Sequence, residues 1–192
     1  MSDYTIELNG YTMEFFEDQH LYLVNGMMLP SITQLLQKKY KHKYLYTAPA
    51  VLQRASERGT ALHEQIETFC KTGVIETREV KHFAFLQKHY GFKVLNNEVP
   101  VVLFSEDEPV ACGRLDLVLE MNGQIGLADI KRVSQLDRQY LFDQLNLYRI
   151  AYQQCYGQEI SFLKGVHIKD DTRRFVNIPI NEELVKKEFL HE

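Results

Sequence analysis

The sequence predicts an α/β fold in which a central mixed β-sheet is flanked by α-helices, and three observations carry this prediction. Asn-Gly pairs interrupt runs of alternating polar and apolar residues, as they do in β-hairpins. Between these runs, long segments repeat apolar residues at helical spacing. The 192 residues are 45% hydrophobic and 25% charged, which is ordinary for one globular domain with a sizeable core. We therefore expect a single domain over residues 1–192.

Residues 1–47 are expected to form short strands and a short helix. Asn-Gly pairs at 9–10 and 25–26 predict tight turns between strands that end at Pro30. Ser31 and Gln34 have the spacing of a capping box, so a helix should begin there.

Residues 48–180 should form the core of the domain, with a C-terminal helix over 181–192. A long helix should run from Pro49 toward Gly73, interrupted at Gly59, and a second helix should cover residues 77–90. A three-stranded antiparallel meander should follow, then a helix capped by Ser134 or Asp137 and ending at Gly157. The strands are expected at 99–104, 109–120, from 124 to near 133, and then at 160–168 and 174–180.

The hairpin around Asn122-Gly123 carries charge inside apolar runs. A two-residue turn there places Asp116 opposite Asp129, with Arg114 and Lys131 on the same face of the sheet. Leu115, Leu117, Leu119, Ala128 and Ile130 should take the other face. Two facing carboxylates repel each other unless something offsets their charge, and a divalent cation such as Mg²⁺ would do so. The alternative is that Asp116 pairs with Arg114 or Lys131 on a solvated face without any catalytic role.

Two further pairs of polar residues lie on helices. His63 and Glu67 are four residues apart and share a helix face, and Gln144 and Tyr148 repeat this geometry. Taken singly, each pair also fits a purely structural role.

Taken together, four segments resemble a known family. GTALHEQIE, GRLDLV, ADIK and QLNLY, in this order over about residues 58–150, resemble the PD-(D/E)XK nuclease superfamily and specifically its RecB-like, phage-type exonuclease branch. Residues 20–36 also resemble the segment that precedes the core in phage-type members. The resemblance implies a restriction-endonuclease-like core. It also implies a deoxyribonuclease, an exonuclease in DNA recombination or repair, that uses Mg²⁺ or Mn²⁺.

The resemblance assigns roles to individual residues. Asp116 and Asp129 match the two metal-binding acids, Lys131 matches the catalytic lysine, and His63 matches a histidine that approaches the metal. The backbone carbonyl of Ile130 would complete the metal sphere. Leu115 stands where the superfamily's name has proline.

Supporting roles fall on a second group of residues. Glu67 matches the helix acid, and Gln144 and Tyr148 match a pair that supports the site and contacts nucleic acid. Arg114 is expected to join this supporting group, and Glu98 corresponds to an acid that precedes the meander in many relatives.

Charge and cysteine content narrow the class of protein. A net charge of −4 excludes a surface covered in positive charge, so contact with DNA would need a local track, that is, a row of positively charged side chains on one part of the surface. Residues 37–46, which interleave lysine and tyrosine, are a candidate for that track, and a solvated helix end is the alternative.

Three widely spaced cysteines predict reduced core residues and no iron-sulfur cluster. The polar N-terminus and the lack of a long apolar run predict a cytoplasmic protein with no membrane contact.

Other functions remain as alternatives. Implied partners are DNA, a phage single-strand annealing or replication protein, and further copies of this chain. A catalytically silent nuclease fold that binds nucleic acid or opposes host defence is the main competing hypothesis. A small-molecule enzyme is disfavoured because the sequence has neither a glycine-rich phosphate loop nor a nucleophile elbow.

Overall fold

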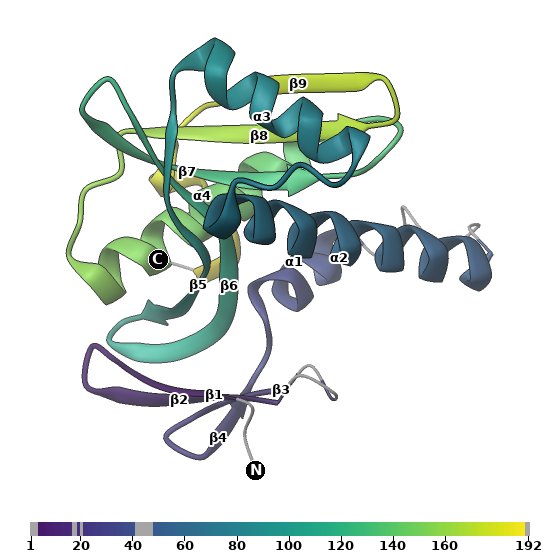
Figure 1. Ribbon diagram of the computed structural model, residues 1–192. Coiled ribbons are helices and arrows are strands. Elements are labelled where there is room, and N and C mark those ends of the chain that lie inside the picture. Colours follow the sequence, from purple (N-terminus) through teal and green to yellow (C-terminus); the bar gives the residue numbers. More distant parts are fainter. Residues whose placement is uncertain (1–3, 17–18, 20, 41–47, 191–192) are drawn as a thin grey trace.

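The described residues form two β-sheets, and the fold is α/β, as predicted. The computed structural model describes residues 4–16, 19, 21–40 and 48–190, and Figure 1 shows how the elements are arranged. None of the described helices is long and apolar enough to cross a membrane.

The N-terminal strands form a four-stranded antiparallel meander. It consists of β1 (Tyr4–Leu8), β2 (Tyr11–Phe16), β3 (Leu21–Val24) and β4 (Met27–Leu29), in that order. Asn9 and Asn25 have positive φ, as the predicted Asn-Gly turns require. Met13 and Phe15 of this sheet pack against Val102 and Cys112, so the meander covers one end of the central sheet.

The short helix α1 (Ile32–Tyr40) follows directly and begins with the predicted capping box. Gln34 N donates to Ser31 Oγ at 3.0 Å, and Ser31 N donates to Gln34 Oε1 at 2.8 Å.

The central sheet has five strands in the order in which they occur along the chain. They are β5 (Lys93–Ser105), β6 (Glu108–Met121), β7 (Gln124–Lys131), β8 (Phe162–Lys169) and β9 (Thr172–Ile178). Neighbouring strands are antiparallel except β7 and β8, which are parallel. The sheet is therefore mixed, and its first strand is longer than the predicted 99–104.

Helices cover both faces of this sheet. The long helices are α2 (Pro49–Thr72), α3 (Arg78–Tyr90) and α4 (Arg138–Tyr156), and the chain ends with α5 (Glu182–Val185) and the π-helical turn η2 (Lys186–Leu190). Side chains of α2 and α3 pack on one face, and those of α1 and α4 pack on the other. In Figure 1, α4 is the crossover that connects parallel strands β7 and β8.

Local sequence explains where helix α4 begins and ends, and the structure corrects the expected interruption of helix α2. The Asp137 side chain accepts a hydrogen bond from Tyr140 N, so Asp137 rather than Ser134 caps α4, and Gly157 ends the helix in the left-handed conformation. The predicted interruption at Gly59 is wrong. Helix α2 continues through this residue because an isolated glycine costs a helix only about 1 kcal/mol.

The three cysteines are free, as predicted. Cys112 is buried, whereas Cys70 and Cys155 are half-buried at the edges of the core. Cys155 nevertheless contributes to packing, since its Sγ donates to the carbonyl oxygen of Val102 at 3.3 Å.

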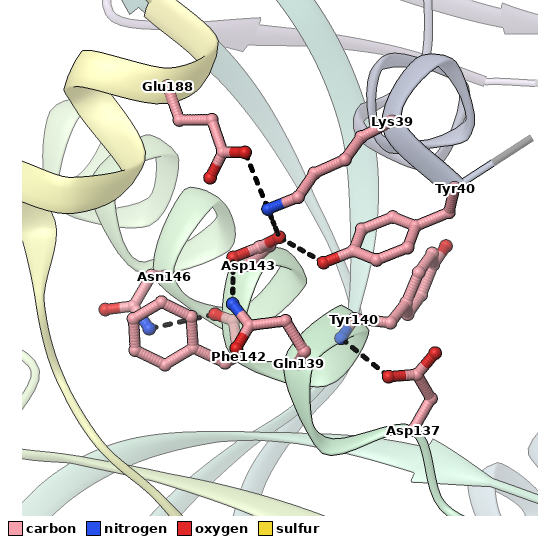
Figure 2. Close-up of polar contacts among 9 residues, drawn as sticks. All are labelled: Lys39, Tyr40, Asp137, Gln139, Tyr140, Phe142, Asp143, Asn146 and Glu188. Atoms are coloured by element: carbon pink, nitrogen blue, oxygen red, sulfur yellow. Dashed lines mark hydrogen bonds and ion pairs between the residues drawn. The ribbon is translucent and has the colours of Figure 1, made fainter.

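A buried carboxylate ties α1 to α4 and to the C-terminal turn (Figure 2). Asp143 is fully buried and accepts hydrogen bonds from Lys39 Nζ at 2.7 Å, Tyr40 Oη at 2.5 Å and Gln139 Nε2 at 3.1 Å. Lys39 Nζ also lies 2.7 Å from Glu188 Oε1. Each donor satisfies part of a charge that would otherwise be costly to bury.

This network gives two residues of the candidate nucleic-acid track at residues 37–46 a structural role. Lys39 and Tyr40 point inward to Asp143, because the apolar face of α1 and the buried acid draw them toward α4. Residues 41–46 lie outside the described part of the chain.

The Asp143 network makes a stability prediction. We expect Asp143→Ala to lower the free energy of unfolding by roughly 2–4 kcal/mol, because the hydroxyl of Tyr40 and the amide of Gln139 lose their buried acceptor. Glu188→Gln should cost less than about 1 kcal/mol, because this acid is partly exposed. Urea unfolding of both variants tests the difference, and equal losses would contradict the role given to Asp143.

Candidate active site

The predicted hairpin register is confirmed over five residue pairs, and it then ends where the acids lie. The pairs run from Met121 with Gln124 to Leu117 with Ala128. Beyond this point Ile130 N donates to the Asp116 carboxylate at 2.6 Å instead of to a β6 carbonyl. Asp116 and Asp129 are therefore not a ladder pair. The β6–β7 ladder ends at Leu117 and Ala128, whereas β7 stays paired with β8 as far as Lys131 and β6 stays paired with β5.

The two faces of the hairpin are mostly as predicted. Leu117, Leu119, Ala128 and Ile130 pack with α2 and α3, and Val118 packs with α4 on the opposite face. Leu115 is the exception, since it lies in the cluster with α1 and α4. At Leu115, β6 has already left β7 and pairs only with β5, so the simple alternation of the flat hairpin no longer applies.

Three metal-ligating side chains meet at this opening, each from a different element. His63 of α2 places Nδ1 3.5 Å from Asp116 Oδ1 and 3.6 Å from Glu98 Oε1 of β5. One ligand atom from each of the three residues lies within 4.8 Å of the others. An imidazole and two carboxylates at this separation are suitable ligands for one divalent cation.

The other nitrogen of His63 fixes the orientation of the ring. His63 Nε2 lies 3.1 Å from the carbonyl oxygen of Ile130, which can only accept a hydrogen bond. The Ile130 carbonyl, expected as a metal ligand, is thus engaged with the imidazole in this structure. Nδ1 is the nitrogen directed at the acids.

Asp129 and Lys131 lie together beside this group. Lys131 Nζ is 2.6 Å from Asp129 Oδ2, and the Asp129 side chain is almost completely buried. The ammonium group of Lys131 also lies 5.9 Å from the ring centre of Tyr140, which the sequence analysis did not identify. Both side chains line a pocket of about 240 Å³ that also contains Asp116 and His63.

Burial and crowding of charge shift the pKa values of the acids upward. The pKa of Asp129 is raised to about 6, because burial and the neighbouring Asp116 raise it more than Lys131 lowers it. Burial also raises the pKa of Asp116, against the lowering effects of His63 and Lys131. Burial thus disfavours the charged form of both acids, and a bound cation would favour it.

The pKa values of the basic groups of the site are also raised, which favours their charged forms. Burial alone would lower the pKa of His63, but Asp116, Glu98 and Asp129 outweigh it and raise that pKa to about 9. The pKa of Lys131 is likewise raised, because Asp129 and Asp116 overcome the effect of burial. Lys131 is thus an ammonium at neutral pH.

Helix α4 brings Gln144 and Tyr148 to the same pocket, as expected. Gln144 is buried, and its Oε1 has no hydrogen-bond partner among the described residues. Tyr148 lies against the backbone of β6 at Gly113, where an added Cβ would be 2.8 Å from the tyrosine hydroxyl oxygen. The absence of a side chain at Gly113 therefore permits the close approach of Tyr148.

The remaining predicted residues border the site. Glu67 lies one helical turn after His63, lines an adjoining pocket of about 390 Å³, and pairs with Lys71 at 2.5 Å. Arg114 Nε lies 3.5 Å from Glu98 Oε2, and its guanidinium carbon lies 4.8 Å from the ring centre of Phe15. Arg114 therefore links the site to the N-terminal sheet.

Glu98 has a larger place in the site than its sequence indicated. It has a φ of 48°, in the left-handed region, inside a strand. A non-glycine residue rarely adopts this conformation, and such strain is concentrated at functional positions. The resemblance had pointed to Glu98, but the sequence contains no pattern that predicts its left-handed conformation or its contact with His63.

Comparisons with known proteins add little. No family model matches the sequence, and no curated protein does. Of the solved structures, 15 chains match the fold, and one of them is described as "Crystal structure of SSO0001". It is 17% identical, with a TM-score of 0.43, over 84% of this chain and 75% of that chain. This likeness says nothing about the chemistry of the site.

The raised pKa of Asp129 makes stability depend on pH. The Asp129 carboxyl keeps its proton up to about pH 6 in the folded state, whereas a free aspartate, with a pKa of 3.8, loses it at lower pH. The protonated Asp129 therefore contributes to stability at low pH, and this contribution is lost as the pH rises through about 6. In EDTA, the stability of Asp129→Asn relative to the wild type should increase by up to about 3 kcal/mol between about pH 4 and pH 7.

Denaturant unfolding at several pH values measures this difference. Asp170→Asn is the matched control, because the Asp170 side chain is 70% exposed and its substitution should give a difference that is nearly constant with pH. A constant difference for Asp129→Asn as well would show that burial does not raise the pKa of Asp129.

Proposed function

We propose that this protein is a metal-dependent nuclease with a restriction-endonuclease-like core, and that it hydrolyses phosphodiester bonds in DNA. The observation that carries the proposal is the opening between β6 and β7. There His63, Glu98 and Asp116 converge beside the ion pair of Asp129 and Lys131. The order of the four sequence segments supports the same assignment to the PD-(D/E)XK superfamily.

The donor set fits Mg²⁺ or Mn²⁺. Carboxylate oxygens suit both ions, and a cation would offset the cost that burial imposes on the charged forms of Asp116 and Asp129. Asp116 and Glu98 would hold the ion with His63 Nδ1, and Asp129 lies next to them. When bound, the ion would polarise the phosphate and make a water molecule more acidic.

The residues of the chain would supply the remaining interactions. Lys131 carries a positive charge held in place by Asp129, so it can stabilise negative charge that develops on the phosphate. The raised pKa of Lys131 argues against its acting as the base at neutral pH. The amide of Gln144 and the hydroxyl of Tyr148 lie in the same pocket, where they can orient the nucleic acid.

Cleavage assays test the proposal. End-labelled linear and circular DNAs, single- and double-stranded, are incubated with Mg²⁺, Mn²⁺ or EDTA. We expect cleavage that EDTA abolishes, and an exonuclease would degrade linear DNA but leave closed circles intact. Product ladders also give the polarity of degradation.

Substitutions in the site should remove this activity without unfolding the protein. We expect Asp116→Asn, Asp129→Asn and Lys131→Met each to reduce the cleavage rate by at least about 100-fold. Lys164→Met is the control, because Lys164 lies on the neighbouring strand β8, above the ring of Phe175 and away from the acids. This variant should cleave DNA as fast as the wild type does. Cleavage retained by the Asp129 or Lys131 variant would refute the assignment. A protein that binds DNA and never cleaves it would be the silent nuclease fold instead.

Glu98 provides a separate test of the metal site. Calorimetric titration with Mn²⁺ should show about tenfold weaker binding for Glu98→Gln than for the wild type, because one of three charged or imidazole ligands becomes neutral. Glu120→Gln is the control, since this acid pairs with Lys93 at the far end of β6. Equal affinities for all three proteins would mean that Glu98 does not bind the ion.

A further inference from the structure

A second polar pocket lies next to the acidic opening. It has a volume of about 290 Å³, and its lining includes Ser134, Arg138, His167, Thr172 and Arg174, with no carboxylate among its lining residues. The chain passes directly from one pocket to the other, because residues 130–133 line the site near His63 and residues 134–136 line this one.

The register of three strands places a row of basic side chains across the sheet. Lys131 of β7 pairs with His167 of β8, and His167 pairs with Arg174 of β9. Paired residues on neighbouring strands point to the same face, and each strand step is about 4.8 Å, so the row extends roughly 10 Å from the catalytic lysine. Along one strand of a duplex, roughly 10 Å of helix axis corresponds to about three nucleotides.

Packing on both sides of the sheet shows which face carries this row. Gly165 precedes His167 by two residues, and a Cβ there would lie 2.5 Å from Leu141 of α4. Val166 and Ile168 belong to the cluster formed with α2 and α3. The row therefore lies on the α4 face, which is also the face of Asp129 and Lys131.

His167 is buried with one nitrogen unsatisfied. It is 3% exposed, and its Nε2 lies 2.7 Å from the carbonyl oxygen of Val133. Its Nδ1 has no hydrogen-bond partner among the described residues. A buried polar atom without a partner is unusual, and at the lining of a pocket it indicates a missing ligand. Nε2 donates to this carbonyl, so Nδ1 is the ring nitrogen left to contact a ligand in the pocket.

The arginines of this pocket also lack acidic partners. Arg174 is exposed and makes no ion pair or hydrogen bond with any described residue, and Arg138 makes only a 3.5 Å contact with the carbonyl oxygen of Asn177. Elsewhere on the sheet and α4, by contrast, Arg132 and Arg149 each pair with a glutamate. The pocket therefore presents uncompensated positive charge, although the whole chain is acidic.

We propose that this pocket binds a backbone phosphate of the nucleic acid strand, a few nucleotides from the phosphate held at the acids. The identity of the ligand rests on the proposed nuclease function. Arg174 and Arg138 would contact the phosphate oxygens, with His167 Nδ1 and the hydroxyl of Thr172 completing the pocket. Such a contact fixes the position of the strand without reading its sequence.

Arg173 and Arg174 provide a matched pair of variants. They are adjacent and chemically identical, but Arg173 points to the other face, where its guanidinium carbon lies 3.9 Å from the ring centre of Phe85. Binding of fluorescent single-stranded and duplex DNA is measured by anisotropy in EDTA, over a range of salt concentrations, for the wild type, Arg174→Gln and Arg173→Gln. Thermal melting of each variant verifies that the fold is retained.

We expect Arg174→Gln to weaken binding by about tenfold and to lower the slope of log affinity against log salt by about one, because one phosphate contact is lost. Arg173→Gln should match the wild type in both respects. Arg138→Gln should act in the same direction as Arg174→Gln. Equal slopes for the wild type and both arginine variants of the pocket would overturn the proposal.

The outcome is separate from that of the cleavage assay. A wild-type protein that cleaves DNA while Arg174→Gln keeps the full salt slope leaves the nuclease assignment standing and removes the phosphate pocket. A wild-type protein that never cleaves DNA, but loses affinity and slope in Arg174→Gln, keeps the pocket as a nucleic-acid contact and removes the nuclease assignment.

Discussion

The hydrogen bond from Ile130 N to the Asp116 carboxylate is the contact on which the rest of the site depends. It lies where β6 and β7 stop pairing, and it replaces a backbone acceptor that the separating strands can no longer supply. Because a side chain takes over this role, β6 and β7 can separate after Leu117 and Ala128 while β7 stays paired with β8 and Asp116 is held in place. The separation of the strands also makes room for His63 and Glu98 to approach.

Packing elsewhere in the fold offsets the destabilisation that the buried charges of this opening cause. Three carboxylates and two basic groups are gathered in partly buried positions, and burial raises the pKa values of Asp116 and Asp129. Large apolar clusters on both faces of the sheet compensate for such local destabilisation. The satisfied Asp143 network shows the contrasting case, in which a buried acid has enough donors of its own.

Much of this architecture could be predicted from local sequence signals. The Asn-Gly turns, the capping box at Ser31 and the register from Met121 to Leu117 follow from short-range rules, and the structure agrees with them. The left-handed φ of Glu98 and its contact with His63 could not be predicted, because both depend on how β5 meets α2. The inward direction of Lys39 was missed for the same reason, since only tertiary packing brings Asp143 beneath α1. Contacts between residues far apart in the chain produce no pattern of residue spacing in a single sequence, so they could not be predicted from it.

Gly113 has a consequence for how the sequence of such a protein can change over time. The ring of Tyr148 occupies the space that any side chain at position 113 would need. A side chain at position 113 therefore requires the ring at position 148 to move or to be replaced by a smaller residue. In a family of related chains, a residue larger than glycine at position 113 should occur together with a residue smaller than tyrosine at position 148.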